Sequence, residues 1–352
     1  MIDTLKSYWS SSSGVGRFGT VIILLATFAS LFAYVIIPDT THFANLQVPE
    51  YNLLPPGSQR TLLEYRDQGE WSLLQGYSGI TTAIPMTELV GKSGAIIDYR
   101  DINGNLRTQT VQSLEPYTLA ELQSDMVKTK TYYFGTDKYG RDLLSRLILG
   151  IRISLLSGFI AVIISTLIGV VVGLTSGYFG GWLDAVTLFV INSLWAFPTI
   201  LFVFAIVMAF GRSITVIFVA VGCTLWIDVA RLVRGRTKEV KEEVYVKAAK
   251  SYGASSYRIL KDHILPNLIG PLLVLVAANF AIAILIEAGL SYLGFGVNPP
   301  QPSLGNILNE NYGYALSGLT FMAAIPALFI MVLVLSFNFV SKSIKDYADA
   351  NG

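Results

Sequence analysis

The chain has 352 residues, of which 53% are hydrophobic and only 14% are charged. This composition excludes an ordinary soluble domain and indicates a protein embedded in a membrane. The net charge of +1 gives no general affinity for nucleic acid. One cysteine, Cys223, and two distant histidines, His42 and His263, predict neither a disulfide framework nor a metal site.

Six long apolar runs predict an all-α polytopic membrane protein with six transmembrane helices. They cover residues 18–37, 153–175, 185–210, 214–233, 268–287 and 319–340. A cleaved signal peptide is the alternative for the first run, but no small-x-small cleavage site accompanies it. With six crossings, both termini are expected on the same side of the membrane.

Charge position predicts which side that is. Lys6 and Arg17 precede the first run, and Lys342 and Lys345 follow the last. Between residues 231 and 261, nine Lys or Arg stand against three Glu. Because basic loops stay in the cytoplasm, both termini and this loop are predicted to be cytoplasmic.

Residues 38–133 form a polar segment between the first two runs and are predicted to be an extracytoplasmic α+β insertion. Residues 95–100 and 106–111 flank Asn103-Gly104, a favoured tight-turn pair, and predict a β-hairpin. Thr118 and Glu121 have the spacing of a capping box and predict a short helix. Gly91-Lys-Ser93 resembles the end of a phosphate-binding loop, but Met86 occupies the position of its first glycine, so no nucleotide site is expected.

The cytoplasmic loop predicts two short helices. One helical face carries four residues at helical spacing: Tyr245, Ala248, Ala249 and Tyr252. Gly253 suits the end of this helix, and Ser255 or Ser256 suits the start of a second helix that runs to Leu265, before Pro266 opens the next span. A solvated basic loop against lipid headgroups is the alternative.

Two segments of this loop carry a family resemblance. Lys247-Ala-Ala-Lys-Ser-Tyr-Gly253 and, nine residues later, His263-Ile-Leu-Pro266 resemble the E-A-A-x3-G-x9-I-x-L-P loop of binding-protein-dependent ABC importer permeases. The resemblance implies that the loop at 240–266 couples this chain to a separate ATPase. The implied coupling residues are Tyr245, Lys247, Ala248, Ala249, Tyr252, Gly253, Leu265 and Pro266. His263 departs from the usual Ile and Lys247 from the usual Glu. Lys247 implies either that the partner ATPase carries a matching change, which is our prediction, or that this contact contributes little.

Three further motifs resemble oligopeptide, dipeptide and nickel permeases, with the C-type subunit as the nearest pattern. They are Phe134-Gly-Thr-Asp137 with Gly140-Arg-Asp-Leu-Leu-Ser-Arg146, Ala230-Arg-Leu-Val-Arg-Gly235, and Ser291-Tyr-Leu-Gly-Phe-Gly-Val-Asn-Pro-Pro-Gln-Pro-Ser303. The resemblance covers residues 134–345, whereas 58–130 looks like an insertion relative to the family. It implies the type I importer fold: a first span within 1–37, the insert 38–133, a core 134–345 that contains the cytoplasmic segment 234–266, and a tail 346–352.

The same resemblance implies the partners and the reaction. Two ABC ATPase subunits hydrolyse ATP, a homologous second permease completes the pore, and an extracytoplasmic solute-binding protein delivers substrate at the bacterial inner membrane. This chain, in contact with membrane lipid, is expected to bind no cofactor or metal and to be no enzyme. Di- or oligopeptides are the expected substrates, with nickel or another small solute, or export, as alternatives. A secondary transporter is disfavoured because broken, charged helices in repeated halves are not evident.

Two residues are candidates for the translocation path. Pro198 lies in the third apolar run and is expected to kink it, either along the path or for packing. Glu287 ends the fifth run and serves either an outer gate or a local contact. In the second run, small residues recur every fourth position and predict close helix packing, static or sliding: Ser157, Ala161, Ser165, Gly169, Gly173 and Gly177.

Overall fold

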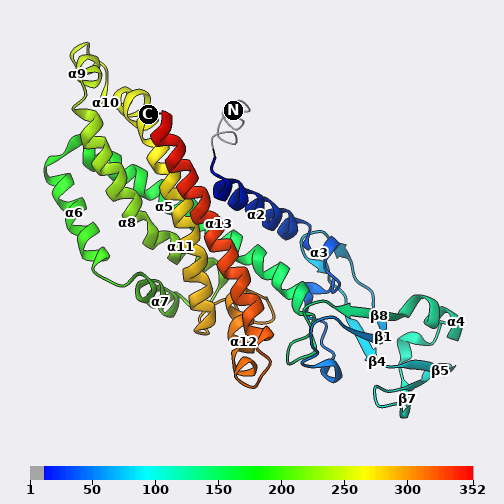
Figure 1. The fold of residues 1–352 in the computed structure, drawn as a ribbon. Helices are drawn as coiled ribbons and strands as arrows, with labels where there is room; N and C mark the ends of the chain where they lie inside the picture. The colour runs from blue at the N-terminus through cyan, green and yellow to red at the C-terminus, as the bar shows by residue number, and fades with distance from the viewer. Residues whose placement is uncertain (1–11, 352) are drawn as a thin grey trace.

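The molecule is a bundle of long helices with a β-rich domain at one end (Figure 1). The structure is a computed structural model and describes residues 12–351, so Lys6 and Gly352 lie outside the described part. Among these residues, five helices are long and apolar enough to span a membrane, or six if one bent pair counts as a span. They are α2 (Gly14–Leu31), α5 (Leu143–Phe179), α8 (Ile214–Lys241), α11 (Leu265–Tyr292, continuous from Ser256) and α13 (Phe321–Asn351). An all-α polytopic membrane protein is confirmed.

The most extensive helix–helix contact in the bundle is between α5 and α8. The six small residues at every fourth position of α5 are all buried. A methyl group added at Gly169 would lie 2.4 Å from Cβ of Val229, and one at Gly173 would lie 2.7 Å from Cβ of Val233. The stripe therefore lets the two helix backbones approach closely within this one chain, as small residues do in lipid.

The third apolar run forms two helices instead of one kinked span. α6 (Gly181–Trp195) and α7 (Thr199–Phe210) meet at 90°. Pro198 has no N–H to donate and disfavours helical backbone at Phe197, so the helix stops and the chain turns. The pair is a broken span or a re-entrant loop, so the chain bends at Pro198 as expected but more sharply than a kink within one helix.

The insert contains eight strands in three small sheets. The first sheet has the order β4-β1-β8 and is antiparallel: β1 is Ser58–Arg66, β4 Thr81–Pro85 and β8 Val127–Tyr132. β2 (Trp71–Ser72) pairs with β3 (Gly76–Tyr77). β5 (Glu88–Ser93), β6 (Ile96–Arg100) and β7 (Leu106–Thr110) form a meander, which confirms the predicted hairpin.

Short helices complete the chain. Thr118 and Glu121 make the predicted capping box at the start of α4 (Leu119–Glu121). The other short elements are α3 (Ala33–Ile36), the 3-10 turns His42–Ala44, Pro49–Tyr51 and Gln112–Leu114, and the π-helical turn Leu122–Met126. α12 (Leu304–Leu316), between α11 and α13, was not predicted. Leu63, Met86 and Ile97 are among the buried residues that form the core of the insert.

A buried cluster of charges joins the segment before α5 to α12. Arg141 donates from Nε to Asp137 at 2.6 Å and from Nη2 to Glu310 at 2.7 Å. Arg146 lies within 3.8 Å of both carboxylates. Two cations and two anions thus neutralise each other inside the protein, which is the condition for burying them.

Candidate ATPase-coupling site

The end of the bundle opposite the insert carries the loop that connects α8 to α11 (Figure 1). α8 has 28 residues and is about 42 Å long at 1.5 Å per residue, longer than a hydrocarbon core of about 30 Å. Its last turns contain Lys238 and Lys241, so the helix extends beyond the apolar layer. The loop is therefore built on a helix that projects from the membrane.

The loop folds as the sequence predicts in its first half. α9 covers Val244–Ser251, and Gly253 ends it with φ of +84° while its neighbour Ala254 donates to the carbonyl of Ala249 at 3.1 Å. This backbone arrangement is the left-handed helix ending that glycine favours. The Ser255 hydroxyl then accepts from the N–H of Arg258 at 3.3 Å and starts the second helix.

The second helix of the loop does not end at Pro266. α10 (Ser256–Arg258) continues through a π-helical turn, Ile259–Ile264, directly into α11. Pro266 lies in the first turn of α11, directly after this π-helical turn. The expectation of two separate helices before the span is therefore corrected: only α9 is separate.

One face of α9 is buried and the other is exposed. Val246 is 2% exposed and packs with Ile259 and Ile264, whereas Val244 is 81% exposed. Tyr252 is 92% exposed at the end of the helix. Ala248 is exposed and Ala249 partly so, which keeps the surface between the tyrosines low. Within residues 12–351, Ala248 and Tyr252 are therefore uncovered, whereas Tyr245, predicted to share their face, has contacts inside the loop.

Other predicted coupling residues have partners inside the loop. The Tyr245 hydroxyl accepts from Asn267 Nδ2 at 3.1 Å, and its ring lies edge-on to His263 with centroids 6.2 Å apart. Lys247 Nζ lies 3.0 Å from Glu242, and this interaction lowers the pKa of the Glu242 carboxyl. Leu265 is partly buried and Pro266 exposed.

The base of the loop is fixed to α5 and α6. Asp184, in the first turn of α6, accepts from Arg234 Nη2 at 3.0 Å and from Lys238 Nζ at 2.6 Å. Lys241 donates to the carbonyl of Tyr178, near the end of α5, at 2.7 Å. Three basic residues of α8, Arg234, Lys238 and Lys241, are thus held, so a force on the loop acts on the α5–α8 pair.

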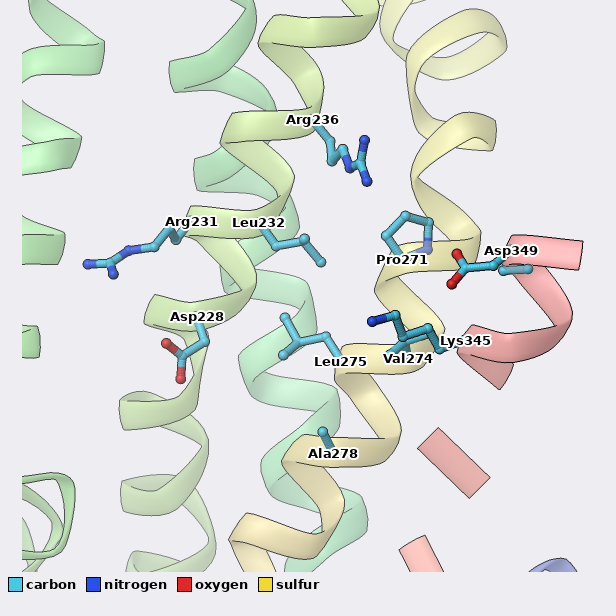
Figure 2. A pocket seen from close by; sticks show the side chains of 11 residues that line it. Asp228, Arg231, Leu232, Arg236, Pro271, Val274, Leu275, Ala278, Lys345 and Asp349 are labelled. Carbon is cyan, nitrogen blue, oxygen red and sulfur yellow. The ribbon is translucent and has the colours of Figure 1, made fainter. Parts of the chain in front are cut away.

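A cavity of about 570 Å³ lies between α8, α11 and α13 near this end. Figure 2 shows Leu232 of α8 and Leu275 of α11 pointing toward each other across it, with Lys345 and Asp349 of α13 at its far wall. Arg231 turns away, stacks over the ring of Trp195 at 4.2 Å and donates to Asn192 at 3.3 Å. The two helices that leave and enter the loop therefore form opposite walls of one cavity.

The two path candidates lie away from the loop. Glu287 is completely buried in α11 and accepts from Ser154 at 2.9 Å and from Ser291 at 2.8 Å. Pro198 lies at the bend between α6 and α7, next to the exposed Phe197. These contacts give Glu287 a packing role between α5 and α11, and its part in a gate stays a prediction.

Sequence reasoning missed the cluster around Arg141. Asp137 and Arg141 are four residues apart in a turn before α5, whereas Glu310 lies 169 residues beyond Arg141. No helical spacing in the sequence links these charges. Among residues 12–351, no group of three or more His, Cys, Asp or Glu side chains could hold a metal ion.

Comparisons with known proteins agree on one family. Residues 166–350, more than half of the chain, match the model of the binding-protein-dependent transport system inner membrane component. The glutathione transport system permease protein GsiD of Pectobacterium atrosepticum is 36% identical over 224 residues, which are 63% of this chain and 73% of that protein. The dipeptide permease DppC of Bacillus subtilis is 35% identical over 64% of this chain and 71% of its own length. The oligopeptide permease OppC of the same organism is 36% identical over 65% and 74%.

Proposed function

Because this chain belongs to the family of inner membrane components of binding-protein-dependent transport systems, we propose that it is a permease subunit of an ATP-driven importer of di- or oligopeptides. It is a multi-pass membrane protein, and the names of its relatives, which include a glutathione permease, support a peptide as the substrate class. Nickel or another small solute is the alternative. The protein itself carries out translocation, and ATP is hydrolysed by partner subunits.

The exposed face of α9 is the single observation that carries the coupling mechanism. Val244, Ala248 and Tyr252 form an exposed surface that no part of this chain covers within residues 12–351. A tyrosine with a large exposed ring beside small residues is suited to a recessed partner surface. We assign this face to contact with one of two ATPase subunits.

Force on this face would reach the membrane through the fixed base of the loop. Asp184, Arg234 and Lys238 bind the end of α8 to α6, and Val246 binds α9 to the start of α11. When the ATPase subunits close on ATP, α8 and α11 would move together at their cytoplasmic ends and change the cavity between them. A homologous second permease would supply the other half of the pore.

This mechanism sets the orientation in the membrane. The basic loop and both termini are cytoplasmic, and the insert faces the side from which a solute-binding protein delivers substrate. We propose that the insert contributes to docking that protein. Deletion of residues 60–128 that leaves transport and binding-protein affinity unchanged would contradict this role.

The test is the ATPase activity of the complex purified through this subunit and reconstituted in lipid. Candidate solute-binding proteins are added empty, loaded with peptide, or loaded with nickel. Stimulation by a peptide-loaded protein is the expected result. A nickel response would reassign the substrate, and a complex that responds to no binding protein would contradict import.

A further inference from the structure

The hairpin of β2 and β3 exposes apolar side chains at its turn. Trp71, Leu73 and Leu74 are all exposed, Leu74 by 61%. Turn positions in water are ordinarily polar, and clustered exposed apolar groups mark a contact surface. We therefore expect these apolar side chains to be buried against lipid or another protein.

One arginine places this turn at the level where the first span ends. Arg152 of α5 donates from Nη1 to the carbonyl of Leu74 at 2.7 Å and from Nε to the carbonyl of Ser30 at 2.6 Å. α2 ends at Leu31 and its 18 residues are about 27 Å long, close to the roughly 30 Å thickness of the hydrocarbon core. Because one guanidinium group binds both carbonyls, Leu74 lies at the same level as the end of α2, where the hydrocarbon core ends.

The hairpin is also held in place from its other side. The N–H of Tyr77 donates to the carbonyl of Thr40 at 2.8 Å, and His42 Nδ1 lies 2.8 Å from the carbonyl of Gln75. Gly76 packs so closely on Tyr34 that an added Cβ would lie 2.5 Å from the ring. These contacts keep the turn beside the bundle.

An apolar groove continues from the turn along the spans. Its volume is about 510 Å³, and Leu74 is the residue of the insert that lines it. Leu31 of α2 and Leu155 and Phe159 of α5 are among its lining residues. Leu31 and Phe159 are themselves exposed, so the apolar surface of the turn is continuous with that of two membrane spans.

We propose that the 71–75 turn is a membrane anchor of the insert, seated in the outer leaflet with a phospholipid acyl chain in the groove below Leu74. Trp71 takes the interfacial position that tryptophan favours. The anchor fixes the height of the insert above the bilayer. The proposal rests on the proposed function only in naming the leaflet as the outer one.

Fluorescence quenching in the reconstituted full complex tests this contact. A Cys223→Ser background receives Leu74→Cys or Leu106→Cys, each labelled with a polarity-sensitive fluorophore. Leu74 and Leu106 are matched, since both are 61% exposed leucines of the insert, and Leu106 lies on the meander. Phe28→Cys on α2 is the lipid-facing standard. Quenchers are phospholipid with a nitroxide near its headgroup and aqueous iodide.

The label at 74 is expected to behave like the label at 28: blue-shifted emission, quenching by the nitroxide lipid, and loss of most iodide quenching relative to 106. Iodide quenching equal to that at 106 would overturn the anchor. Shielding from both quenchers would also overturn it and assign the turn to the second permease. If Leu74→Cys does not fold, Leu73→Cys makes the same comparison. ATPase subunits that fail to copurify would count against the proposed function without altering the quenching result.

Discussion

The α5–α8 seam and the loop that continues from α8 are neighbours in the chain, yet they use their side chains in opposite ways. Along the seam, small residues are buried and backbone approaches backbone, as at Gly169 and Val229. In the loop, Val244 and Tyr252 are largely exposed, while Val246 is buried and packs α9 against the π-helical turn before α11. The seam is completed within this chain, whereas the exposed face of α9 is left uncovered within residues 12–351.

Substitutions in the two regions should therefore have different effects, on folding in the seam and on coupling to the ATPase in the loop. A change in the seam removes packing that no partner replaces, so stability should fall first. A change on the exposed face of α9 removes little from the folded chain and should act on the complex. Four variants test this difference, and they are ordered by their expected effect on the isolated subunit.

Gly169→Val should have the largest effect. The new Cβ would lie 2.4 Å from Cβ of Val229 and 2.9 Å from the backbone nitrogen of Ala230, so the helices must separate. We expect a loss of about 3 kcal/mol or more, at the upper end for over-packed cores. Gly235→Val is the control, since nothing lies within 4 Å of its added Cβ. Equal melting temperatures of the two variants in detergent would contradict close packing of α5 against α8 at Gly169.

Glu287→Ala should destabilise the subunit by about 1–3 kcal/mol, because the hydroxyls of Ser154 and Ser291 lose their buried acceptor. Glu287→Gln keeps one acceptor and should cost less. Thermal unfolding measures both. Transport abolished in a Glu287→Gln variant of unchanged stability would instead place this residue in the translocation path.

Lys247→Glu should leave the melting temperature of the subunit unchanged, because Lys247 and Glu242 are both exposed and surface pairs contribute little. It should weaken binding of the ATPase, whose surface is expected to match the lysine. Copurification and ATPase rate in the complex measure this. Binding and coupling that survive unchanged would mean that the partner carries no matching group.

Tyr252→Ala should likewise have little effect on folding, within about 0.5 kcal/mol, as expected for an exposed side chain. Its effect on the complex should be large, with loss of binding-protein-stimulated ATPase activity. Tyr133→Ala is the matched control, because Tyr133 is an exposed tyrosine directly after β8, outside the loop. Equal stimulation in the two variants would contradict the assigned interface.

The apolar runs and the turn chemistry were sufficient to predict most of the fold. The capping box at Thr118, the glycine ending at Gly253 and the stripe on α5 are local patterns, and all three occur as expected. The 90° break at Pro198 was underestimated, because a proline in an apolar run is compatible with either a kink or a stop. α12 and the Arg141–Glu310 contact depend on tertiary packing between distant segments, which one sequence does not display.

The most direct test of coupling through the loop at 240–266 is cross-linking from a single cysteine at position 252 in the assembled complex. A Tyr252→Cys, Cys223→Ser subunit is treated with a short bifunctional reagent, with and without a non-hydrolysable ATP analogue. We predict a cross-link to the ATPase subunit whose yield changes with the nucleotide. An ATPase that copurifies but is never cross-linked from 252, while other cytoplasmic positions react, would contradict coupling through this loop.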